Sequence, residues 1–95
     1  MENNKIEITA VNVFPYQGTG VYRCLGMATI VLNDCFLVRG LRIMDGENGL
    51  FVGYPQDPYY KGEDFRTLCS PVTREMRERI ETAVLEKYQL ATMEG

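Results

Sequence analysis

Two turn signals divide the apolar stretch of residues 21–52 into three strands. The segment "VYRCLGMATIVLN" is rich in β-branched residues, which predicts a long strand with the alternating set Ala28, Ile30 and Leu32. Asn33-Asp34 tolerates positive φ, so "CFLVRGLRIM" is expected to return antiparallel through a tight hairpin. The following "DGENG" predicts a second hairpin, to a short strand at "LFV". An antiparallel sheet is therefore expected.

Changes of register are predicted in two of the strands. In "IEITAVNVF", the first strand, the apolar positions change parity, which suggests a bulge near Thr9 and Ala10. In "CFLVRGLRIM", strict alternation places Leu37 on the face of Leu41 and Ile43, and it separates Arg39 from Arg42. Gly40 lies between the two arginines and is a candidate bulge that would reset this register.

A helical period replaces the strand period after residue 72. Between Thr73 and Tyr88, apolar residues recur on one stripe, at Met76, Ile80, Ala83, Val84 and Tyr88. Thr73 is a candidate N-cap, and Ser70 followed by Pro71 is an alternative start. Leu85 falls on the polar side, where a partner could cover it. The expected fold is α+β: one domain, residues 1–95, with about four antiparallel strands, a long loop and a C-terminal amphipathic helix packed on the sheet.

Composition argues against several classes of function. Histidine is absent and Ser70 is the only serine, so an enzyme is not expected. The acidic clusters lack the spacing of a metal site, and we expect neither a metal nor a cofactor. The three cysteines are far apart, which predicts free thiols that are buried or half-buried. The net charge of -3 argues against a strongly electrostatic nucleic-acid binder unless the basic residues are unevenly placed.

Targeting signals are not evident in the sequence. No window reaches the roughly eighteen uncharged apolar residues that a membrane span needs. The first five residues are polar rather than basic and then apolar, unlike a signal peptide. We therefore expect a cytoplasmic protein with no membrane span.

A candidate binding region lies at the junction between the long loop and the helix. Residues 54–71 have no period and contain Tyr54, Tyr59 and Tyr60, whose rings could stack on bases. If this loop folds back over the helix start, four basic residues would form a patch for phosphate groups: Lys61, Arg66, Arg74 and Arg77. Ordinary packing of the tyrosines, with surface pairing of the cations to Glu63 and Asp64, is the alternative.

Two blocks of this sequence resemble the SpoVG family, that of stage V sporulation protein G. They are "FLVRGLRIMDGENGLFVGYP" and "GEDFRTLCSPVTREMRERIETAVLEKY", and the resemblance spans about residues 28–88. It implies a small bacterial cytoplasmic homodimer with an antiparallel sheet and a C-terminal helix. It also implies a regulator of septation or sporulation that binds DNA, and in some members RNA, through basic residues that correspond here to Arg66, Arg74 and Arg77.

The chain departs from the family pattern at two places. Many relatives have a basic "SKR" step after the proline, where this chain reads "PQDPYY", and Ser70 takes the place of a histidine before the helix. Both changes predict weaker phosphate binding, because neutralisation of phosphates supplies most non-specific affinity. A protein-interaction module of the division machinery, without nucleic-acid binding, is the alternative hypothesis.

Overall fold

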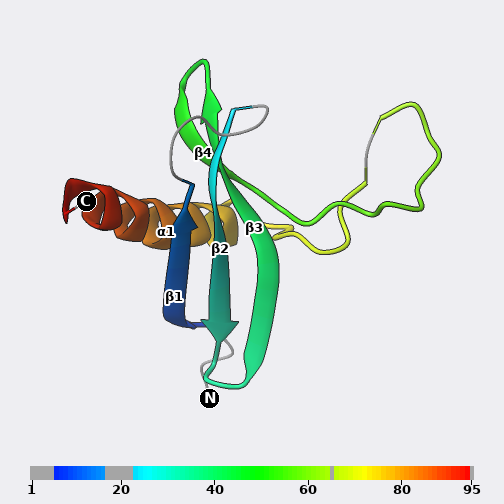
Figure 1. The fold of residues 1–95 in the computed structure, drawn as a ribbon. Coiled ribbons are helices and arrows are strands. Elements are labelled where there is room, and N and C mark those ends of the chain that lie inside the picture. The colour runs from blue at the N-terminus through cyan, green and yellow to red at the C-terminus, as the bar shows by residue number, and fades with distance from the viewer. Residues whose placement is uncertain (1–5, 17–22, 65, 95) are drawn as a thin grey trace.

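The protein folds as a four-stranded antiparallel sheet with one long helix packed on it (Figure 1). A computed structural model describes residues 6–16, 23–64 and 66–94. In chain order the elements are β1 (Ile8–Pro15), β2 (Cys24–Leu32), β3 (Phe36–Gly46), β4 (Gly49–Gly53) and α1 (Arg74–Glu94). The strands lie in sequence order, so β1 and β4 are the two edges. The α+β prediction is confirmed, although the predicted start of β2 at residues 21–22 lies outside the described residues.

Both predicted hairpins form, and each uses the residues that tolerate positive φ. Asn33 and Asp34 have φ values of 52° and 57°, the combination of a type I′ turn. The Cys35 N–H closes the turn by donating to the Leu32 carbonyl at 3.0 Å. Gly49 ends the second turn with φ 117°. These two connections fix the order β2-β3-β4.

The bulge at Gly40 decides which side chains of β3 face the helix. Gly40 has φ 85°, and the pairing of β2 with β3 shifts register opposite it. Val38 therefore shares the core face with Leu41 and Ile43. The predicted grouping of Leu37 with that face is wrong, because the extra residue turns Leu37 outward, where it is 50% exposed.

The same bulge places Arg39 and Arg42 together on the outer face of the sheet, the face away from the helix. Strict alternation would have separated them, so the register break proposed for Gly40 is confirmed. The bulge predicted near Thr9 is also present, as a register shift between Ile8 and Ala10.

The helix begins at its predicted N-cap and runs further than predicted. The Thr73 hydroxyl oxygen accepts from the Met76 N–H at 3.1 Å, and its carbonyl accepts from Arg77, so the alternative start at Ser70 is wrong. The helix continues past Tyr88 to Glu94, because residues 89–94 include neither proline nor glycine.

The buried core lies between α1 and the inner face of the sheet. Ile80 and Val84 of the helix pack against a sheet layer made of Ala28, Ile30, Leu41, Ile43, Val52 and Tyr54. Leu85 is half-buried against this core, so its predicted place on the polar side is wrong. Cys24 is buried as expected, whereas Cys35 and Cys69 are exposed free thiols.

The segment between β4 and α1 projects away from the sheet as a long loop (Figure 1). An antiparallel bridge between Gln56 and Thr67 ties its two limbs together. The radius of gyration is 14.1 Å, whereas a compact chain of this length is expected to have about 12 Å. No helix among the described residues is long and apolar enough to cross a membrane.

Candidate nucleic-acid interface

A groove of about 690 Å³ runs along the β4 edge, between the sheet, the projecting loop and the first turns of α1. Three arginines from three different elements line it: Arg42 of β3, Arg66 of the loop and Arg77 of α1. Glu81 is the acidic residue of the lining. Its carboxylate accepts from the Val52 N–H on the β4 edge at 3.5 Å. The groove therefore has an excess of positive charge.

Arg77 is held in the groove by an aromatic ring. Its guanidinium lies 5.5 Å from the centroid of the Tyr54 ring and donates to the Pro71 carbonyl at 3.5 Å. Tyr54 is 6% exposed, and its hydroxyl is buried without a partner among the described residues. Burial raises the pKa of Tyr54, and the nearby Arg77 charge opposes that shift in part. The neutral Tyr54 ring thus makes a cation–π contact with the Arg77 guanidinium.

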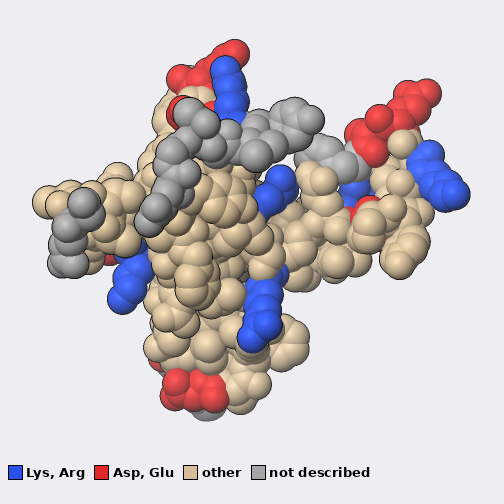
Figure 2. Space-filling view, in the orientation of Figure 1, with Lys and Arg blue, Asp and Glu red and all other residues tan. Residues whose placement is uncertain are grey.

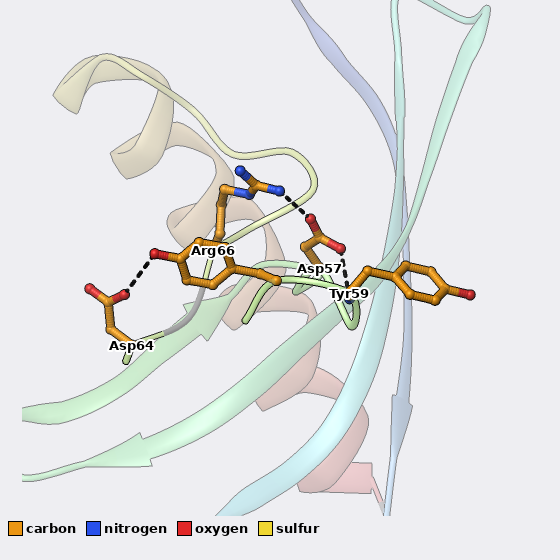
Figure 3. Close-up of polar contacts among 5 residues, drawn as sticks. Asp57, Tyr59, Asp64 and Arg66 are labelled. Atoms are coloured by element: carbon orange, nitrogen blue, oxygen red, sulfur yellow. Dashed lines mark hydrogen bonds and ion pairs between the residues drawn. The ribbon is translucent and has the colours of Figure 1, made fainter. Parts of the chain in front are cut away.

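Arg66 is held by two groups of the loop (Figure 3). Its Nη2 donates to Asp57 Oδ2 at 2.7 Å, and its guanidinium lies 4.8 Å from the centroid of the Tyr60 ring. The Asp57 N–H also donates to the Arg66 carbonyl, so these two residues are linked by both a main-chain and a side-chain hydrogen bond. The Arg66 side chain remains 63% exposed, whereas that of Asp57 is 13% exposed. Arg66 can therefore still reach a ligand from its ion pair.

The ion pair lowers the pKa of Asp57. The hydrogen bond from Arg66 is the largest cause, followed by a hydrogen bond from the Tyr59 N–H, which donates to Asp57 Oδ1 at 2.9 Å. Tyr60 contributes a further contact in the loop, because its hydroxyl donates to Asp64 Oδ1 at 3.3 Å. Figure 3 shows the Tyr59 ring extending away from this cluster, and Tyr59 is 84% exposed.

Arg42 is a groove residue that the sequence did not single out. Its Nη2 donates to the Tyr54 carbonyl at 3.3 Å, and its side chain lies against Gly53 of the neighbouring strand. The signal that could have found it was its place between the apolar Leu41 and Ile43, because alternation with these two core residues puts Arg42 on the outer face, beside the β4 edge.

Only two of the four predicted basic residues line the groove. Arg66 and Arg77 line the same groove, as expected, but the lining includes neither Lys61 nor Arg74. Lys61 is exposed at the loop tip near Glu63 and Asp64, where Figure 2 shows basic and acidic groups side by side. Arg74 is exposed at the first residue of α1. The loop runs outward instead of folding over the helix start, which explains why Lys61 lies outside the groove (Figure 1).

Comparison with known proteins identifies one family. The SpoVG family model matches residues 6–90. A relative from Phytoplasma australiense, named as a candidate septation protein SpoVG, is 38% identical over 84 residues, covering 88% of this chain and 84% of the relative.

Two further relatives carry the same name. One from Anaeromyxobacter is 36% identical over 90 residues, covering 95% of this chain and 89% of its own. One from Archaeoglobus fulgidus is 36% identical over 83 residues, covering 87% and 94%. The family match spans the sheet, the projecting loop and most of the helix. The chain belongs to the SpoVG family.

Proposed function

We propose that this protein is a SpoVG-type cytoplasmic regulator of septation or sporulation that binds DNA or RNA, mainly through phosphate contacts. The observation that supports this most directly is the convergence of Arg42, Arg66 and Arg77 on one groove. The names of the relatives link them to septation, and this chain matches those relatives over most of its length. The proposal does not involve catalysis, a metal or a cofactor.

The groove suits a phosphate backbone better than it suits an isolated small anion. Its arginines come from a strand, a loop and a helix, so they offer separate positions for successive phosphates rather than one cradle. Lys61 and Arg74 are exposed outside the groove and are proposed as peripheral contacts. Three phosphate contacts predict a slope of about -2 to -3 for log K against log salt concentration.

Fluorescence anisotropy with a labelled oligonucleotide at several salt concentrations tests the proposal. The double variant Arg66→Gln plus Arg77→Gln is expected to weaken binding and to lower the salt slope by about 1.4 to 1.8. Lys87→Gln is the matched control, because Lys87 is an exposed cation of α1 outside the groove. The absence of binding at low salt, or equal losses in the variant and the control, would contradict the proposal.

We also propose that the protein acts as a homodimer, which would double the number of groove arginines. The projecting loop supports this, because Leu68 at its base is 64% exposed and Val72, just before the helix, is 95% exposed. A second copy could cover these apolar side chains. Sedimentation equilibrium of the full chain tests it: a monomer mass at micromolar concentration would rule out a stable dimer.

The same exposed apolar side chains support a second candidate function, a protein-interaction module of the division machinery that needs no nucleic acid. Pulldown from a native lysate, with and without nuclease, separates the two candidates. Partners that persist after nuclease and are lost in Val72→Asp favour the second candidate, and partners that vanish with nuclease favour the first.

A further inference from the structure

The outer face of the sheet has an unusual composition for a surface that no described helix covers. Helix α1 packs on the inner face, and the outer face carries Arg39, Arg42 and exposed apolar side chains. Leu37 is 50% exposed and Phe51 is 43% exposed there. Figure 2 shows basic groups over β3, with acidic groups at the hairpin ends and the loop tip.

This face carries positive charge that no neighbouring strand residue neutralises. Asp45 is the one acidic residue in the four strands, and it has the parity of Ile43, so it projects from the opposite face. Arg39 and Arg42 are brought together on the outer face by the bulge at Gly40. An anion is therefore favoured as the occupant of this surface.

The outer face is continuous with the groove. Arg42 and Phe51 belong to the sheet face by strand parity, and both also line the groove at the β4 edge. A polyanion that contacts Arg39 could therefore continue past Arg42 and Phe51 to Arg66 and Arg77 without leaving the protein surface. Phe51 is an exposed ring that lines this path.

We propose that the outer face of the sheet binds single-stranded nucleic acid, with a base stacked on Phe51 and phosphates on Arg39 and Arg42. This deepens the proposed function and rests on it. An exposed ring on a sheet offers its π-face to an unstacked base, whereas bases in a duplex have their faces covered by their neighbours. This surface is therefore expected to bind single strands in preference to a duplex.

A second copy of the chain fits this surface less well. A two-fold axis through the face would bring Arg39 and Arg42 of both copies together, and the strands supply no carboxylate there to compensate. Like charges brought together in an interface oppose association, whereas the same charges attract a polyanion. Charge complementarity thus selects nucleic acid over a second copy.

Anisotropy titrations with a labelled oligothymidylate of about twelve nucleotides, and with a duplex of equal length, test the inference. Phe51→Leu keeps an apolar side chain and removes the ring, and it is expected to weaken single-strand binding by about fivefold or more, and by more than it weakens duplex binding. Phe36→Leu is the matched control, because Phe36 is 62% exposed but lies on the inner face.

Arg39→Gln supplies a second test that does not depend on the packing of Phe51. It is expected to weaken single-strand binding and to reduce the salt slope by about 0.7. Urea unfolding of each variant confirms that the sheet is intact. Equal affinity for single strand and duplex, or loss of affinity no greater in Phe51→Leu and Arg39→Gln than in Phe36→Leu, overturns the inference.

The groove variants show which proposal has failed. If Arg66→Gln plus Arg77→Gln weakens binding but the sheet variants do not, the outer face is not a binding surface while the proposed function stands. If the wild-type protein binds neither probe at low salt, both the inference and the proposed function are wrong. If the sheet variants change the sedimentation mass instead of the affinity, the face is a protein interface and the inference is wrong.

Discussion

The Asp57 carboxylate holds the guanidinium of Arg66 at 2.7 Å, at the edge of the groove where a phosphate would bind. Asp57 lies in "PQDPYY", the segment that the resemblance led us to expect as a departure from a basic step. It gives Arg66 an internal anion that would compete with any phosphate at that position.

Asp57→Asn is expected to strengthen nucleic-acid binding. An exposed ion pair is weak, so releasing Arg66 should raise affinity by only a few-fold at low salt. Anisotropy titration measures the change. Glu63→Gln is the matched control, because it removes one negative charge from the same loop outside the groove. An equal gain in the control would attribute the effect to net charge rather than to the pair.

The pKa of Asp57 is expected to lie below its ordinary value of 3.8 in the folded protein. Because the folded-state pKa is depressed, the stabilising contribution of the pair is present above the unfolded pKa and is lost as the pH falls through the folded pKa. Carboxyl NMR titration measures it. In Arg66→Gln the pKa should rise but stay below 3.8, since the Tyr59 N–H still donates to the carboxylate. An unchanged pKa in that variant would show that Arg66 is not the main cause.

Thr73→Ala is expected to lower the free energy of unfolding by about 1 kcal/mol, because the Met76 N–H loses its capping acceptor. Thr73→Ser keeps a hydroxyl and should retain most of the stability. Urea unfolding followed by circular dichroism compares the two variants with the wild type. Equal losses in both would indicate that the hydroxyl bond is not what stabilises the helix start.

Gly40→Val is expected to destabilise the sheet by about 2 to 3 kcal/mol, because a β-branched residue is strained at φ 85°. Gly40→Asn should cost less, since asparagine tolerates the left-handed region, although its Cβ would still meet Pro55 at 3.3 Å. Urea midpoints for both variants check the order. If the two variants are equally stable, the positive φ is not what requires glycine.

The fold could be predicted because its signals are local. Asn33-Asp34 and Gly49 supply positive φ at the two turns, and Thr73 caps a helix whose buried residues follow a helical period. The face predicted for Leu37 from strand alternation was wrong, because alternation does not account for the extra residue that the bulge at Gly40 inserts. At the two turns, the helix cap and the bulge, the success or failure of the prediction depended on backbone geometry within a few residues.

The candidate site was harder to predict because it depends on where a loop without periodicity runs. Arg66 and Arg77 were expected together and do line one groove, whereas Lys61 lies at the loop tip and Arg74 outside the lining. Arg42 joins them from a strand far away in the sequence. No periodic pattern in residues 54–71 determines these positions, since the loop is held by side-chain contacts such as that of Asp57 with Arg66.

The projecting loop separates surface charge from folding stability, two properties that are coupled in most small domains. Between Gln56 and Thr67, no described residue belongs to the buried core, and the main polar contacts of the loop are made within itself. Substitutions in this segment can therefore change the charge of the loop at little cost to folding. Natural variation could alter that charge over a wide range while the sheet and the helix stay the same.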